Sequence, residues 1–339
     1  MKKKCVETIF YKYNIDAFII KDLSNFFWFT GQKVTNWWLI FKKDFKYILT
    51  DSRYIERFKN FEDWKVFNIA DLKLWILNFL KEELNVYRIG IEWKSWNVLE
   101  YKKLVEVFSE DNIVLLKDDV ERCRAIKSLD EINKIKEAIK IINLVYDNLE
   151  KNFKNYVWFS EIDIRREIIY KIFQYGGEGE SFESIVAFWK NTSIPHWQSS
   201  RNNLLRENMP VLIDMGAIYQ GYCSDFTRSF WFWNKIDKLW QKIYDLVRKA
   251  HDEVWKIAKP WIKISDLDKK AREILAEWGF DKYFTHALGH WIGIDVHEYP
   301  IISWKNDDIL KPWMVFTIEP GVYLPWKFGV RRENIKIIS

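Results

Sequence analysis

The chain has 339 residues, 48% of them hydrophobic and 30% charged, which is long enough for two domains with packed cores. Its 53 Lys and Arg and 48 Asp and Glu residues are interspersed, so the net charge of +5 predicts a solvated surface rather than a nucleic-acid-binding one. No apolar run reaches the roughly 18 residues of a membrane span, and no signal-peptide apolar region follows the basic N-terminus. We therefore expect a cytoplasmic protein with no membrane partner.

The three cysteines, Cys5, Cys123 and Cys223, are an odd number without the spacing of metal ligands. They indicate neither a disulfide framework nor a zinc knuckle.

Residues 1–120 are predicted to form an α/β domain, because short apolar strands alternate with helical patterns. The sheet is expected to be mostly parallel or mixed. This part has no glycine loop that could hold a phosphate and no cluster of catalytic residue types, so it is interpreted as a scaffold or dimerisation domain. The expected elements are a helix ending near Asn14, strands at 17–20, 39–41, 47–49 and 86–91, a helix opening at Asp51, and a helix over 99–108.

Residues 109–126 are interpreted as a connection to a second domain, residues 127–339. Ser128 and Glu131 have the spacing of a capping box and start a long amphipathic helix. Ser160 begins a second helix that reaches Phe173. The other expected elements are strands at 184–188, 211–214, 223–230 and 314–318, and helices at 236–258 and 265–277.

Three of the five histidines, His286, His290 and His297, lie within twelve residues. Neutral imidazole is the commonest metal ligand and a usual proton carrier near pH 7. Four carboxylates at strand ends or turns flank this segment. Each alone has an ordinary interpretation as a turn or core residue, but one His with four carboxylates suits a pair of divalent ions. The four are Asp214, Asp225, Glu319 and Glu333.

In the order and spacing of its motifs, the segment 127–334 resembles the pita-bread metallopeptidases, the group of Xaa-Pro aminopeptidase, prolidase and methionine aminopeptidase. Residues 1–120 resemble the creatinase-type N-terminal domain of the Xaa-Pro branch. The predicted fold is α+β, with a pita-bread catalytic domain at 127–339 preceded by a smaller creatinase-like α/β domain at 1–120. The matching pieces are Ile194-Pro-His196, Asp214-Met-Gly216, Tyr222 to Arg228, His286 to Pro300, Thr317 to Gly321, Arg331 and Glu333, with Asn25 to Gly31 and Thr50 to Tyr54 in the first domain.

This resemblance implies two divalent metal ions, with manganese expected first and cobalt, iron or zinc allowed by the ligand types. A hydroxide between the ions would attack the peptide, Glu319 would act as the base, and His297 would steady the oxyanion. His196 and His286 would contact the substrate, and Arg331 would orient Glu333 or the substrate. The implied metal ligands are Asp214, Asp225, His290, Glu319 and Glu333, with Asp225 and Glu333 bridging the ions.

The implied activity is hydrolysis of Xaa-Pro bonds in proline-containing peptides, by a homodimer. Aminopeptidase P and Xaa-Pro dipeptidase both fit the sequence. A methionine-type or general aminopeptidase is an alternative that His286 and the N-terminal domain disfavour. A third interpretation is an inactive binding homologue on the same fold.

One departure from the family pattern is systematic: the chain has 20 Trp and only 12 Gly. Glycine serves where φ must be positive or where backbones approach closely, so tryptophan is its least suitable replacement. We hypothesise that these positions are glycine in the cell, encoded by UGA codons. Genuine tryptophans, in a decayed homologue or an aromatic-rich site, are the alternatives. Where the family has glycine, the chain has Trp158, Trp189, Trp197, Trp233, Trp261, Trp291, Trp313 and Trp326.

The chain stops six residues after Glu333, earlier than the family pattern. We expect either an unprotected sheet edge or a shortened gene product.

Overall fold

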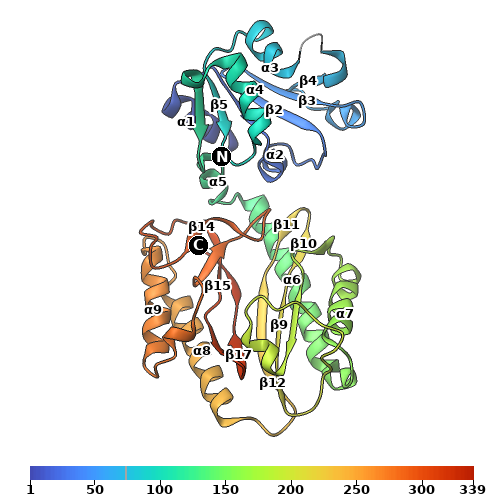
Figure 1. The fold of residues 1–339 in the computed structure, drawn as a ribbon, viewed down its shortest axis with the longest axis vertical. Helices are drawn as coiled ribbons and strands as arrows, with labels where there is room; N and C mark the ends of the chain where they lie inside the picture. The colour runs from blue at the N-terminus through green and yellow to red at the C-terminus, as the bar shows by residue number, and fades with distance from the viewer. Residues whose placement is uncertain (73–74) are drawn as a thin grey trace. The chain divides into compact units, whose positions relative to one another are not determined.

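The computed structural model describes residues 1–72 and 75–339. The chain divides into two compact units, Met1–Arg124 and Ala125–Ser339 (Figure 1). Among the described residues, the helices lack the length and apolar character that a bilayer span needs.

The first unit is built on a six-stranded mixed sheet with the strand order β4-β3-β2-β1-β5-β6. β1 pairs antiparallel with β2 and parallel with β5, as the prediction of a mixed sheet allowed. Its strands are β1 (Ala17–Ile20), β2 (Trp37–Lys42), β3 (Phe45–Thr50), β4 (Lys65–Asn68), β5 (Ile89–Glu92) and β6 (Ile113–Leu116). Its α-helices are α1 (Lys2–Tyr13), α2 (Leu23–Thr30), α3 (Ile76–Asn78), α4 (Val98–Phe108) and α5 (Asp119–Arg124).

Three expectations for this unit were wrong. The presumed connection at 109–126 contains the edge strand β6, which is four residues long and is defined by its parallel pairing with β5. The helix expected from Asp51 is only a 3-10 turn at Ile55–Phe58, although Asp51 Oδ1 accepts from the Arg53 backbone N–H as a cap would. Cys5 and Cys123 form a disulfide across a separation of 118 residues, which joins α1 to α5.

The second unit contains two helix pairs, the first packed on one sheet and the second on strands of two sheets. One core joins α6 and α7 to β8, β9 and β12, and the other joins α8 and α9 to β13, β15 and β17 (Figure 1). The helices are α6 (Leu129–Asn152), α7 (Glu161–Gln174), α8 (Lys238–Ile257) and α9 (Ile264–Ala276). The strands are β7 (Gly179–Glu180), β8 (Ile185–Phe188), β9 (Met209–Met215), β10 (Ala217–Tyr219), β11 (Tyr222–Cys223), β12 (Phe226–Phe232), β13 (Gly289–Trp291), β14 (Glu298–Ile302), β15 (Val315–Ile318), β16 (Gly321–Leu324), β17 (Phe328–Arg331) and β18 (Asn334–Ile337).

Local sequence accounts for the long helices of this unit. Ser128 and Ser160 both form capping boxes, with Glu131 and Asp163 respectively, so α6 and α7 begin where predicted. β9 and β12 pair antiparallel over seven residues, from Met209 to Met215 on β9, as expected of the hairpin that carries Asp214. The observed arrangement confirms the predicted α+β class.

Six of the eight questioned tryptophans have a left-handed backbone, with φ between +55° and +84°. This conformation costs a residue with a Cβ about 1–2 kcal/mol. The six side chains are also exposed, from 36% at Trp233 to 86% at Trp326, so packing does not compensate for the strain. The six left-handed tryptophans are Trp158, Trp189, Trp233, Trp261, Trp313 and Trp326. Below, "the six-glycine chain" means this protein with glycine at all six of these positions.

The other two questioned tryptophans do not have positive φ. Trp291 is fully buried in the core of the second unit, and its Nε1 lacks a hydrogen-bond partner among the described residues. Trp197 is half-buried, and its Nε1 donates to Glu161. The backbone therefore agrees with the glycine hypothesis at six positions and does not test it at these two.

Candidate metal centre

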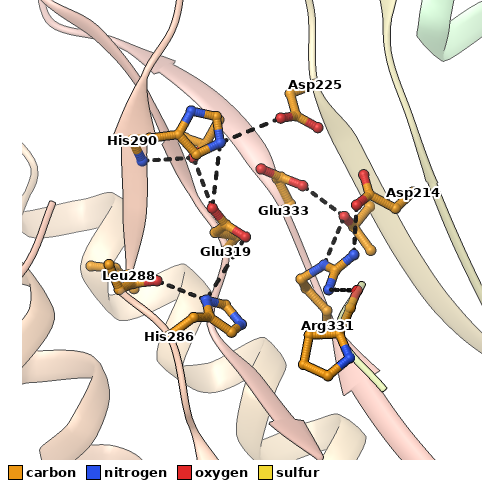
Figure 2. Close-up of polar contacts among 12 residues, drawn as sticks. Asp214, Asp225, His286, Leu288, His290, Glu319, Arg331 and Glu333 are labelled. Carbon is orange, nitrogen blue, oxygen red and sulfur yellow. Dashed lines mark hydrogen bonds and ion pairs between the residues drawn. The ribbon is translucent and has the colours of Figure 1, made fainter. Parts of the chain in front are cut away.

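The five predicted ligands come from both halves of the second unit and face one cavity of about 560 Å³. Each lies in a strand or directly beside one, so the sheets fix their positions (Figure 2). Four are buried, and the side chain of Glu319 is 16% exposed. Asp214 lies in β9, Asp225 precedes β12, His290 lies in β13, Glu319 follows β15, and Glu333 lies between β17 and β18.

Three of the four carboxylates gather around the His290 ring. Atoms of His290, Asp225 and Glu333 lie within 4.8 Å of one another. His290 Nε2 is 3.4 Å from Asp225 Oδ2 and 3.5 Å from Glu319 Oε1 (Figure 2). Asp214 lines the same cavity, but its Oδ2 accepts a hydrogen bond of 2.6 Å from Arg331 Nη2.

The backbone selects the tautomer of His290. Its Nδ1 lies 3.1 Å from the carbonyl oxygen of Trp291, which can only accept a hydrogen bond. A neutral ring must therefore carry its proton on Nδ1 and present the Nε2 lone pair to the carboxylates. The facing atoms are then all acceptors, an arrangement that a cation between them would stabilise.

Three carboxylate oxygens of the site are buried without a hydrogen-bond partner among the described residues: Asp214 Oδ1, Asp225 Oδ1 and Glu333 Oε1. Thr227 Oγ1 donates to the other oxygen of Glu333 at 2.6 Å. Buried polar atoms are nearly always paired, and burying an unpaired carboxylate oxygen is costly. Oxygen-rich ligands of this kind suit divalent cations, so the residues present fit the metal ions that the sequence implies.

Without a cation, the carboxylates destabilise one another. Burial is the first cause that raises the pKa of Asp225 and Glu319 well above the usual range, and the charge of Glu333 is the second. Burial and the charge of Asp214 raise the pKa of Glu333. All three groups must lose their protons to bind a metal.

We expect the affinity for Mn²⁺ to rise with pH above the usual titration range of carboxylates. The sign follows from the raised pKa values: at low pH, Asp225, Glu319 and Glu333 hold protons that the metal must displace. Calorimetry in buffers of different ionisation enthalpy should show proton release on binding that decreases as pH rises. Affinity and proton release that do not change between pH 5 and 8 would contradict this assignment of ligands.

A chain of hydrogen bonds connects Arg331 to His286 through the Tyr323 hydroxyl. Arg331 Nη1 donates to the Tyr323 hydroxyl at 2.9 Å, and that oxygen lies 3.0 Å from His286 Nε2. His286 Nδ1 lies 2.8 Å from the carbonyl oxygen of Ala287, so Nδ1 carries the proton and Nε2 accepts one from Tyr323. Burial and the charge of Arg331 lower the pKa of His286 to about 3. His286 thus lines the cavity as a neutral ring with both nitrogens engaged.

Arg331 was expected to orient Glu333 or the substrate. Among the described residues its ion-pair partner is Asp214, and hydrogen bonds connect it to Glu333 through Thr227, whose hydroxyl accepts from Arg331 Nε at 3.1 Å and donates to Glu333.

His297 and His196 line the same cavity. The His297 ring centroid is 4.2 Å from that of His290. Burial, followed by the charges of His290 and His196, lowers the pKa of His297 to about 4. His297 is therefore neutral at pH 7 and keeps one ring N–H for donation.

Sequence reasoning missed three residues that organise this site. Tyr323 and Thr227 connect Arg331 to the neighbouring side chains, and Glu161 binds the segment that carries His196. Glu161 has the sequence position of an ordinary first-turn acid. Thr227 lies within the matched piece Tyr222 to Arg228, but no local pattern in the sequence gives any of the three a role in the site.

With this geometry established, comparison with known proteins defines the class. Residues 133–339 match metallopeptidase family M24, and residues 5–126 match the creatinase/prolidase N-terminal domain. The chain therefore belongs to metallopeptidase family M24 and is a metallo-exopeptidase. The predicted resemblance and the two-part fold are confirmed.

Individual relatives cover nearly the whole chain. An uncharacterized peptidase, YqhT, of Bacillus subtilis (strain 168) is 31% identical over 340 residues, covering 100% of this chain and 95% of its own. The solved Xaa-Pro dipeptidase from Bacillus anthracis has a TM-score of 0.93 at 27% identity, covering 100% of this chain and 94% of that one. The X-Pro aminopeptidase from Thermotoga maritima MSB8 has a TM-score of 0.87 at 30% identity, covering 98% and 94%.

Proposed function

We propose that this metallopeptidase removes residues from peptides at Xaa-Pro bonds, as an aminopeptidase P or an Xaa-Pro dipeptidase. The observation that carries the proposal is the convergence of unpaired buried oxygens and the His290 lone pair on one cavity. The solved relatives described as Xaa-Pro dipeptidase and X-Pro aminopeptidase support the substrate class. Two divalent ions, with manganese expected first, would be held by Asp214, Asp225, His290, Glu319 and Glu333.

Bound divalent ions would supply a water of lowered pKa and would polarise the scissile carbonyl. Glu319 is the least buried of the five ligands and has an oxygen 3.5 Å from His290 Nε2. In our proposal it takes the proton from the attacking water and returns it to the departing amine. Thr317 Oγ1 donates to Glu319 at 3.3 Å and orients it.

The neutral histidines would act on the substrate oxygen. His297 is held beside His290 and has a ring N–H to donate as negative charge develops on the carbonyl oxygen. His196, which lines the same cavity, would also donate to this oxygen. Arg331 would hold Asp214 in place through its 2.6 Å ion pair rather than contact the substrate directly.

The same cavity offers apolar surface for a prolyl ring. Phe182, Ile185 and Ile301 line it together with the His286 ring. Because both His286 nitrogens are engaged by the protein, His286 would contact the substrate through its ring face. A compact apolar ring without an N–H suits such a surface.

Peptide hydrolysis with added Mn²⁺ tests the proposal. Gly-Pro and Arg-Pro-Pro should both be examined, because a dipeptidase cleaves only the first and an aminopeptidase P accepts the longer peptide. Met-Ala-Ser serves as the control for a methionine-type or general aminopeptidase. Cleavage of Met-Ala-Ser with no cleavage of either proline peptide would refute the Xaa-Pro assignment. The expected homodimer is tested separately by analytical ultracentrifugation.

A further inference from the structure

The segment that carries His196 is anchored by one buried carboxylate in the second unit. Glu161, the first residue of α7, has no exposed surface. It accepts five hydrogen bonds, and all five donors are neutral groups from residues 188–203. Oε1 accepts from Phe188 N (2.8 Å), Asn191 Nδ2 (3.0 Å) and Asn203 Nδ2 (2.8 Å), and Oε2 accepts from Trp197 Nε1 (2.8 Å) and Ser200 N (2.9 Å).

The anchored segment forms one wall of the cavity. Pro195, His196 and Gln198 lie between the outermost donors, Phe188 and Asn203, and line the cavity. Besides its bonds to Glu161, the segment has two further contacts: Arg331 Nη1 donates to the Pro195 carbonyl at 3.3 Å, and Gly329 N donates to Thr192 Oγ1 at 2.9 Å. Four of the five bonds to Glu161 do not involve Trp197, so the anchor persists if that position is glycine.

We propose that Glu161 is a positioning residue that holds His196 at the cavity wall. It does not touch substrate and acts through the backbone and amides of residues 188–203. The kinetic part of this inference rests on the proposed Xaa-Pro activity; the structural part does not. A carboxylate has about four lone-pair sites, and the two oxygens of Glu161 accept from three and two donors.

Glu161→Gln is the most informative variant, because glutamine has the shape of glutamate but replaces one acceptor oxygen with an NH₂ donor. Three donors face one oxygen and two face the other. Either orientation of the new amide therefore turns an NH₂ group toward at least two N–H donors. Glu167→Gln, on the same helix and half-buried, is the matched control.

Two measurements on the metal-free six-glycine chain test whether Glu161 anchors residues 188–203, and neither depends on enzymatic activity. In E161Q, amide hydrogen exchange of Phe188 and Ser200 should accelerate at least tenfold. The ring signal of His196, one of only five histidines, should shift or broaden in the NMR spectrum, while that of His251 in α8 stays unchanged. Unchanged exchange and an unchanged His196 signal would overturn the proposal.

A double-mutant cycle tests whether the effect passes through His196. With Gly-Pro and Mn²⁺, E161Q should lower kcat/KM at least tenfold relative to E167Q at equal metal content. In an H196A background, E161Q should have little further effect. Fully additive losses would show a merely structural role and reject positioning. If the parent cleaves no Xaa-Pro peptide, the proposed function fails, and exchange and NMR still decide the anchor.

Should E161Q not fold, Asn191→Ala keeps the test valid. It removes one donor and leaves the carboxylate with four. The same exchange and NMR changes are expected at smaller size, and their absence would again overturn the proposal.

Discussion

The six-glycine chain is expected to be more stable than the chain with tryptophans by about 5 kcal/mol. Each left-handed tryptophan destabilises the folded chain by about 1–2 kcal/mol. Glycine removes this strain, but its greater freedom in the unfolded state offsets about 0.4–1 kcal/mol of the gain at each site. The net gain over six sites is comparable to the whole stability of many domains, about 5–15 kcal/mol. Urea unfolding of both purified chains measures the difference.

Trp75→Gly is the matched control. Trp75 is 46% exposed, close to the 45% of Trp313, but its φ is −61°. This substitution relieves no strain and should leave stability unchanged or slightly lower. An equal gain at Trp75 and at Trp313 would show that loss of exposed aromatic surface, rather than backbone conformation, is responsible.

The identity of these residues in the cell is a separate question with a direct answer. Peptide mass spectrometry of the native protein distinguishes glycine from tryptophan at each site. Glycine masses at the left-handed positions Trp158 and Trp326 would support UGA recoding. Tryptophan masses there would reject it and favour genuine tryptophans, in a decayed homologue or an aromatic-rich site.

Glu333→Gln is expected to abolish most Mn²⁺-dependent activity, lowering kcat/KM by more than about 100-fold. Loss of even an outer-shell partner of a metal ligand typically costs 10–100-fold, and Glu333 is itself a proposed bridging ligand. Metal content and hydrolysis of Gly-Pro should fall together. Exposed Glu273→Gln on α9 is the control and should retain both.

The stability of E333Q distinguishes a metal-ligand role of Glu333 from a purely structural role. Without metal, Glu333 is buried beside other carboxylates, and its pKa is raised by burial and by Asp214. Removing its charge should therefore leave the metal-free protein at least as stable at pH 7. Added Mn²⁺ should raise the melting temperature of the parent and have much less effect on E333Q. A variant that is destabilised without metal, yet stabilised normally by Mn²⁺, would contradict a ligand role.

Much of the fold follows from local sequence. The Ser128 and Ser160 capping boxes define the starts of α6 and α7, because their hydrogen bonds lie within one helical turn. Apolar runs located β1 and β9. Every residue of these two strands is buried, so the run itself predicts the strand without its pairing partner being known. The edge strand β6 was missed, because its place in the sheet is defined by its parallel pairing with β5.

The sequence by itself determined which residues could form the site: one histidine and four carboxylates at strand ends, in the order of the M24 family. It also indicated the questioned tryptophans, because they stand where the family that the sequence resembles has glycine, which serves where φ must be positive. Only the tertiary structure decided that Arg331 binds Asp214, that Cys5 meets Cys123, and that Glu161 binds residues 188–203. These contacts join positions 27 to 118 residues apart. Their partners are chosen by the packing of sheets and helices, and no local spacing encodes them.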